Sequence, residues 1–218
     1  MAQLDLNETR LVLIRHAHVD TGTHGQRMCG WLDLPLSPTG ERQLKRFRNA
    51  ASGFKPAAVY ASSSSRSRST AEALADNWNA PLTTDPDLRE INCGVTEGML
   101  VEEVKQRYPE LWSRNASQDD CDFAWPDGET YTNFRERVFG ALNRIASRHV
   151  NTRVPVVTHT GAISQVVGAI EGLSPAVWNH HRPAPFTATE IVWSSRAPVR
   201  LLSFNVSDWW RGLPPHAG

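Results

Sequence analysis

The sequence is poor in cysteine, with only Cys29, Cys93 and Cys121 among its 218 residues. The number is odd, and no two of the three show the close spacing of a Cys-x-x-Cys motif. This pattern excludes a disulfide-rich framework and a cysteine-based zinc site. It fits a reducing compartment, so we expect a cytoplasmic protein.

The chain also lacks an excess of charge of either sign, since 23 Lys and Arg residues face 23 Asp and Glu residues. No global field therefore attracts nucleic acid or an anionic membrane, and any attraction for an anionic ligand must be local. The densest basic cluster alternates with Leu44 and Phe47 at helical spacing, which is typical of the solvated face of a helix. This cluster comprises Arg42, Lys45, Arg46 and Arg48.

Long hydrophobic runs are missing too. Nowhere do about 18 uncharged apolar residues run together, as a membrane-spanning helix requires. The first ten residues contain Asp5 and Glu8 and no apolar stretch of signal length, so we expect a soluble protein that is not exported. The length suits one α/β domain covering residues 1–218, without internal repeats.

The most informative segment is the apolar run from Leu11 to Ile14, which leads directly into Arg15 and His16. A buried strand that ends in polar residues places them at the sheet edge where open α/β folds bind ligands. A guanidinium beside an imidazole can hold a phosphate there and attack it. The second Arg-His pair, Arg148-His149, closes a helical pattern, and we interpret it as a solvated helix end.

Two further strand-to-helix junctions follow the same plan. The run 57–61 leads to four serines and Arg66, and the run 154–158 leads to His159 and a Thr160-Gly161 turn. In a parallel sheet with right-handed crossovers, all three junctions share one edge. We therefore expect one cationic pocket, helped by the positive ends of the following helices. Its members are Arg15, His16, Arg66 and His159.

The overall pattern predicts an α/β fold with a mostly parallel central sheet and helices on both faces. Ser37-Pro38 is typical of a helix start, and Thr130 opens a helix whose apolar residues share one face. Segments 188–193 and 199–204 have the pattern of strands. The segment of about 90–127, helical around 101–114 and then irregular, is predicted to form a small helical cap inserted after Glu90 over the sheet edge.

Stretches spread over most of the chain resemble the histidine phosphatase superfamily, which has a phosphoglycerate mutase-like fold. They occur in the family's order and approximate spacing. They are Arg15-His16-Ala17, Gly30 to Gly40, Arg66 to Ala71, Leu88 to Gly94, Glu97-Gly98, Pro126 to Glu129 and Val157 to Gly161. The region from Gly30 to Asp33 resembles α-ribazole phosphatases and broad-specificity phosphatases alike, without choosing between them.

The resemblance implies a phosphomonoesterase that needs no cofactor and works in two covalent steps. It implies that His16 is the nucleophile and forms a phosphohistidine. It assigns Arg15, Arg66 and His159 to the phosphoryl oxygens. Glu90 would protonate the leaving alkoxide and then activate water. Further candidates for binding the phosphate or the substrate are His18, Thr21, Thr23 and Thr160.

Three positions depart from the family's pattern. Ala17 and Thr160 stand where the family usually has glycine, which adds a methyl group and a hydroxyl near the phosphate. Gly22 stands where asparagine is common, so one expected phosphate ligand is missing. Thr21 or Thr23 can take its place.

Two alternatives concern the identity of the acid and the presence of a metal ion. Glu97 lies in the same loop as Glu90 and is an alternative candidate for the acid, although in this pattern it is more often structural. Glu90 itself can instead form an ion pair with Arg89. His18, Asp20 and His24 form a loose array that can bind a metal ion. No helix or strand fixes that array, so we favour substrate contact and predict no metal site.

Two further groups of residues remain. Trp112, Phe123 and Trp125 lie in or beside the predicted cap, where aromatic residues serve core packing or line a pocket for an apolar leaving group. His180-His181-Arg182 is a polar cluster that we interpret as a solvated loop.

Three functions compete. The first is hydrolysis of a small phosphorylated metabolite, with inorganic phosphate as product. The second is a mutase of the same family, but the 69 positions from Glu90 to His159 are fewer than mutases usually have, which favours hydrolysis. The third is an inactive scaffold. Such a protein would normally have lost a catalytic group, whereas all five groups that the resemblance implies are present here: Arg15, His16, Arg66, Glu90 and His159. We expect no nucleic-acid or membrane partner, and the oligomeric state stays open, with a homodimer as one option.

Overall fold

The structure, a computed structural model, describes residues 8–21, 26–50, 53–194 and 196–213. The main elements are β1 (Glu8–Arg15), α1 (Pro38–Asn49), β2 (Val59–Ser62), α2 (Ser65–Trp78), β3 (Leu82–Asp85), α3 (Val101–Arg107), α4 (Pro109–Ser117), α5 (Tyr131–Arg148), β4 (Arg153–Thr158), α6 (Thr160–Ile170), β5 (Ala188–Ser194) and β6 (Arg200–Val206). Short 3-10 helices occupy Pro86–Leu88, Gly94–Thr96 and Trp209–Gly212.

The six strands form one sheet in the order β3-β2-β4-β1-β5-β6. The pairs β3-β2, β2-β4 and β4-β1 are parallel, and β5 and β6 join as antiparallel strands at the other side. This confirms the predicted α/β class with a mostly parallel sheet. Strand β3 was not among the predicted strands, because its sequence, Leu82-Thr83-Thr84-Asp85, is short, polar and half exposed at the sheet edge.

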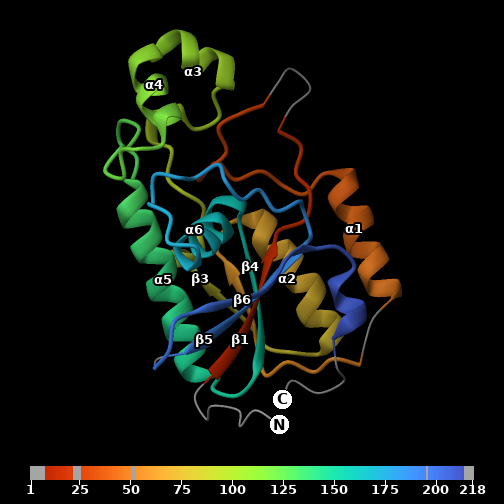
Figure 1. Cartoon of the computed structure of the whole chain (residues 1–218). Coiled ribbons are helices and arrows are strands. Elements are labelled where there is room, and N and C mark those ends of the chain that lie inside the picture. Colours follow the sequence, from red (N-terminus) through yellow and green to blue (C-terminus); the bar gives the residue numbers. More distant parts are fainter. Residues whose placement is uncertain (1–7, 22–25, 51–52, 195, 214–218) are drawn as a thin grey trace.

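Strand β1 is buried on both faces, which explains its continuous apolar run. Leu11 and Leu13 pack in a core with α5 and α6, whereas Val12 and Ile14 pack in a second core with α1 and α2. The same two helix pairs lie on opposite sides of the sheet in Figure 1. The prediction of helices on both faces is therefore confirmed.

Two predicted helix starts are confirmed by their capping bonds. The Ser37 hydroxyl accepts a hydrogen bond from the Gly40 N–H at 3.2 Å, with Pro38 in the first turn of α1. The Thr130 hydroxyl accepts from the Asn133 N–H at 3.1 Å at the start of α5. The basic residues of α1 are exposed on its outer face, as expected.

Helices α3 and α4 lie beyond the sheet end at which β1 finishes (Figure 1). The predicted helix at 101–114 is in fact two helices, because the non-helical backbone of Tyr108 (φ −133°, ψ 57°) and the following Pro109 interrupt it. The segment has a small core of its own, in which Phe123 and Trp125 are buried and Trp112 is partly buried. These aromatic side chains therefore serve packing.

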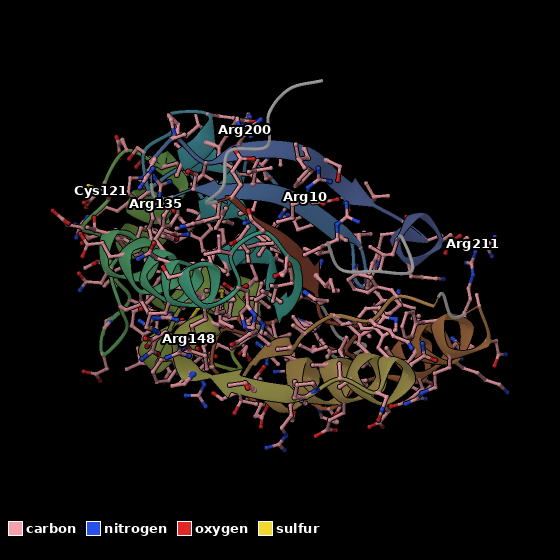
Figure 2. The ribbon with its side chains drawn as sticks, turned by 90° about the horizontal axis from the view of Figure 1, so that it is seen from below. Arg10, Cys121, Arg135, Arg148, Arg200 and Arg211 are labelled. Carbon is pink, nitrogen blue, oxygen red and sulfur yellow. The ribbon has the colours of Figure 1, made fainter. Side chains whose placement is uncertain are left out.

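None of the helices in the described ranges combines the length and apolar character needed to cross a bilayer. Figure 2 looks at the molecule from below, at the end opposite α3 and α4. Its labelled arginines, Arg10, Arg135, Arg148, Arg200 and Arg211, are spread around this view.

Candidate active site

The ends of β1 and β4 bring the two site histidines together. The strands run parallel in register from Arg10 to Arg15, and the His16 N–H donates to the Thr158 carbonyl oxygen at 3.0 Å. The next residue, His159, therefore lies beside His16, and the centroids of their rings are 5.2 Å apart. Arg66 joins them from the first turn of α2.

The hydrogen bonds of His16 define its tautomer. Its Nδ1 lies 2.7 Å from the Ala17 carbonyl oxygen, which can only accept, so Nδ1 carries the hydrogen. Nε2 then holds the free lone pair. Burial lowers the pKa of His16 well below its usual value, and the charges of Arg66 and Arg15 lower it further. The imidazole is therefore neutral and can act as a nucleophile through Nε2.

His159 is held through the opposite ring nitrogen. Its Nε2 lies 2.8 Å from the Ser62 hydroxyl, 3.3 Å from that of Ser67 and 3.4 Å from that of Ser64. Its Nδ1 is buried and has no hydrogen-bond partner within the described protein. Burial, followed by the Arg66 charge, lowers the pKa of His159 well below its usual value. This role of the serines was not predicted from the sequence; the available signal was their position between the end of β2 and the first turn of α2.

The two site arginines are fixed by carbonyl oxygens of distant loops. Arg66 is 2% exposed, and its Nη1 and Nη2 donate to the carbonyl oxygens of Leu32 at 2.7 Å and Gly30 at 2.8 Å. Arg15 Nη1 donates to the Pro183 carbonyl oxygen at 2.8 Å, while its Nε is buried without a partner among the described residues. Burial lowers the pKa of both guanidinium groups, and Glu90 opposes that shift. The guanidinium groups nonetheless remain charged.

Glu90 bridges to the start of α6. Its Oε2 accepts from the Gly161 N–H at 2.8 Å and its Oε1 from the Ile91 N–H at 3.0 Å. Burial raises the pKa of Glu90, although these two bonds and the charges of Arg66 and Arg15 oppose the shift. A Cβ atom at position 161 would lie 2.2 Å from Glu90 Oε1, so any other residue there would displace the Glu90 carboxyl group from this position.

The expected alternative pair of Glu90 with Arg89 does not form. The Arg89 guanidinium instead lies over the Trp31 ring, 4.7 Å from its centroid, and the Trp31 indole N–H donates to the Glu90 carbonyl oxygen at 2.9 Å. Trp31 is 41% exposed, so this pair forms part of the molecular surface beside Glu90.

Arg137 supports the backbone around Glu90 and was not singled out from the sequence. Its guanidinium donates to the carbonyl oxygens of Asp87 at 2.8 Å and Glu90 at 3.2 Å, and it pairs with Glu129. Glu129 also accepts from the Asn92 N–H at 2.8 Å. The Pro126 to Glu129 stretch thus serves to hold the loop that carries Glu90.

Glu97 uses both carboxylate oxygens to hold the backbone. It accepts from the N–H groups of Gly30 at 3.1 Å, Trp31 at 2.6 Å, Leu32 at 3.0 Å and Cys93 at 2.9 Å. The carbonyl oxygens of this same loop bind Arg66. Glu97 is therefore an anchor of the loop, which argues against its alternative role as the acid.

The structure describes only some of the remaining candidate residues. His18 Nδ1 lies 2.7 Å from the Ser37 hydroxyl, and His18 is one of the groups that act electrostatically on His16, so it lies near the pocket. Thr160 is the first residue of α6, and Thr21 is partly buried. Gly22, Thr23 and His24 lie outside the described residues, so the array of His18, Asp20 and His24 is not placed as a set.

Known proteins with similar sequences include a phosphatase and a mutase. The chain is 32% identical to phosphoserine phosphatase 1 of Hydrogenobacter thermophilus over 164 residues, which cover 75% of this chain and 77% of the relative. It is 29% identical to the probable phosphoglycerate mutase GpmB of Cronobacter sakazakii over 164 residues, or 75% of each chain.

The fold and the family profile agree. The crystal structure of the α-ribazole phosphatase from Shigella flexneri superimposes with a TM-score of 0.78 at 22% identity, covering 90% of this chain and 96% of the other. The profile of the histidine phosphatase superfamily (branch 1) matches residues 11–206. With this span, and with the paired histidines at the ends of β1 and β4, the chain belongs to branch 1 of the histidine phosphatase superfamily.

Proposed function

We propose that the protein hydrolyses a small phosphorylated metabolite through a phosphohistidine on His16. One observation carries this proposal: beside the neutral His16, Arg15 Nε and His159 Nδ1 are buried without a partner among the described residues. Buried polar groups nearly always have hydrogen-bond partners. A phosphoryl group in this pocket supplies acceptor oxygens for both nitrogens.

The first step is attack of His16 Nε2 on phosphorus. A P–N bond forms as the P–O bond to the leaving group breaks. Arg15, Arg66 and His159 stabilise the charge on the phosphoryl oxygens. For His159 this requires the Nδ1–H tautomer, which follows if Ser62 donates its hydroxyl hydrogen to Nε2.

Glu90 serves both steps. Because burial raises its pKa, it holds a proton more readily than an exposed carboxyl and gives it to the leaving alkoxide. The resulting carboxylate then takes a proton from water as the water oxygen attacks phosphorus and the P–N bond breaks. Inorganic phosphate leaves, and His16 and Glu90 return to their starting states.

Hydrolysis is favoured over phosphoryl transfer between hydroxyl groups by the short interval between Glu90 and His159. We interpret the chain as one catalytic domain with residues 90–127 as its cap. One relative is a phosphoserine phosphatase and another a probable phosphoglycerate mutase. Given 3-phosphoglycerate, the protein should release inorganic phosphate or leave it unchanged; the 2-isomer as main product would favour the mutase.

We also infer that the protein works in the cytoplasm. All three cysteines are free, as expected in a reducing compartment. The substrate is a small phosphomonoester, and neither a nucleic acid nor a membrane takes part in the reaction.

The phosphoenzyme is the decisive test. With p-nitrophenyl phosphate the first step is fast, so a phosphoenzyme should accumulate during turnover and survive an alkaline quench, but not an acid one. Mass spectrometry of the quenched protein should place the added phosphoryl group on His16, and His16→Ala should carry none. Phosphorylation at another residue would contradict the proposal.

The metal-dependent alternative has a separate test. Hydrolysis of p-nitrophenyl phosphate should survive excess EDTA, because the charge of the pocket comes from arginines. Activity lost to EDTA and restored only by a divalent ion would favour the array of His18, Asp20 and His24.

A further inference from the structure

A cluster of three potential metal ligands lies on the surface after α6. Glu171 follows the last residue of the helix, and His180 and His181 come from the loop that leads to β5. One ligand atom from each lies within 4.8 Å of the other two. No other group of three His, Cys, Asp or Glu residues with such spacing occurs in the part of the chain that the structure describes.

The distances suit a four-coordinate ion. His181 Nε2 lies 2.8 Å and His180 Nε2 lies 4.0 Å from Glu171 Oε2. Ligands of tetrahedral zinc lie about 2.1 Å from the metal, hence about 3.4 Å from each other. The two distances to Glu171 fall on either side of that value, and the two histidine nitrogens lie within 4.8 Å of each other, so side-chain rotations can bring all three atoms to one ion.

Two features of the fold favour a cation here. Glu171 stands at the C-terminal end of α6, where its N–H bonds the Val167 carbonyl oxygen and the helix dipole is negative. The side chain of His181 is only 13% exposed, and its ring packs against Phe204 with centroids 5.2 Å apart. His181 and Glu171 are thus already oriented toward each other by their 2.8 Å hydrogen bond, while the His180 side chain, 57% exposed, is free to adjust.

We infer that Glu171, His180 and His181 form a binding site for a divalent transition-metal ion of the Zn²⁺ class. Imidazole nitrogens with one carboxylate suit zinc and its neighbours, whereas Mg²⁺ and Ca²⁺ prefer oxygen ligands alone. Three protein ligands leave the fourth position to water or to a group from another molecule.

The site connects with the catalytic pocket through the chain. Two residues after His181, the Pro183 carbonyl oxygen accepts the hydrogen bond from Arg15. At its other end, α6 contacts Glu90 through the Gly161 N–H. A bound metal ion therefore restrains the segment that positions Arg15, while the reaction itself uses no atom of this site.

Metal binding can be measured without any activity. The whole protein, stripped with a chelator and dialysed into phosphate-free buffer, should bind one Zn²⁺ per chain in calorimetric titration, and no Mg²⁺ under the same conditions. Co²⁺ should give the visible absorption of a four-coordinate complex. Amide exchange in residues 180–182 should slow when Zn²⁺ is added, because that segment becomes tethered to α6.

Variants distinguish this site from the other zinc ligands of the chain. His180→Ala and Glu171→Ala should each weaken Zn²⁺ binding by about tenfold or more, since even outer-shell changes cost that much. Both side chains are partly exposed, so the variants should keep the wild-type circular dichroism spectrum. His149→Ala, at the far end of α5, is the matched control and should bind like the wild type. Unchanged affinity in both site variants, or no binding by the wild type, would overturn the assignment.

Discussion

The junctions after β1 and β4 hold two neutral histidines in opposite ways. His16 gives its Nδ1 hydrogen to the carbonyl oxygen of its own neighbour, Ala17, which leaves Nε2 as a lone pair. His159 has its Nε2 among three serine hydroxyls, which leaves Nδ1 as the nitrogen without a partner. In the proposed mechanism, the same side chain at equivalent places in the fold therefore attacks phosphorus in one case and donates a hydrogen bond in the other.

Replacing each of the two histidines in turn should have the largest effect on activity and should separate their roles. His16→Ala should lower kcat by several orders of magnitude, because the covalent route is lost. His159→Ala should cost about 10²- to 10³-fold, as expected for a donor to a developing oxyanion. The check is steady-state kinetics together with phosphoenzyme trapping, which should fail only in His16→Ala. A His16→Ala protein that keeps more than about a hundredth of the wild-type kcat would indicate direct attack by water.

Glu90→Gln tests the acid that lies between the junctions. The amide cannot donate a proton to an alkoxide, so kcat/KM for alkyl phosphate esters should fall by about 10²- to 10⁴-fold. With p-nitrophenyl phosphate the loss should be much smaller, since that leaving group departs unprotonated. Equal losses with both esters would instead assign Glu90 to holding the arginines.

The pH dependence of kcat/KM should reflect the opposite pKa shifts of histidine and carboxyl. The pKa of His16 is lowered, so His16 stays neutral and competent well below pH 6.5. The pKa of Glu90 is raised above 4.5, so its acid form persists to higher pH and is lost as pH rises through the shifted value. With alkyl esters, kcat/KM should decline on that basic side. Glu90→Gln should lack this decline, and a decline that remains would assign it to another group.

Ser62→Ala addresses the tautomer of His159 and should have the smallest effect. It removes the nearest of the three hydroxyls, and one hydrogen bond is worth about 0.5–1.5 kcal/mol, or about two- to tenfold in rate. The neighbouring Ser63→Ala, whose hydroxyl is not among those around His159, is the control and should match the wild type in kcat/KM. If Ser62→Ala were as slow as His159→Ala, the tautomer would depend on Ser62 alone.

The sequence predicts the three junctions because each combines a buried apolar strand with an abrupt change to charged or polar residues. This contrast can be recognised in the sequence because the strand interior packs on both faces, whereas the polar residues that follow it line the pocket at the sheet edge. Strand β3 carries no such contrast: Leu82 is partly buried, but Thr83 and Thr84 are exposed. Its place in the sheet depends on pairing with β2, which single-sequence patterns do not contain.

The finer features of the site depend on contacts between distant segments. The anchoring of Arg66 by Gly30 and Leu32, of that loop by Glu97, and of Glu90 by Arg137 all join residues remote in sequence. The break between α3 and α4 had a signal in Pro109, because proline disfavours helical backbone at the residue before it, but the prediction of one helix did not use it. The tautomers of the histidines follow only from their hydrogen-bond partners.

The strand order has a consequence for how the protein is made. Strand β1, which leads directly into His16, pairs with β4 and β5 in the described sheet, and these strands lie at Arg153–Thr158 and Ala188–Ser194. During synthesis β1 can therefore pair in the sheet only after most of the chain has left the ribosome, because the pairings that bury it span more than a hundred residues. The pocket therefore assembles as one of the last events of folding. Truncated nascent chains that end before β4 should be inactive, and their β1 should show no protection from amide exchange.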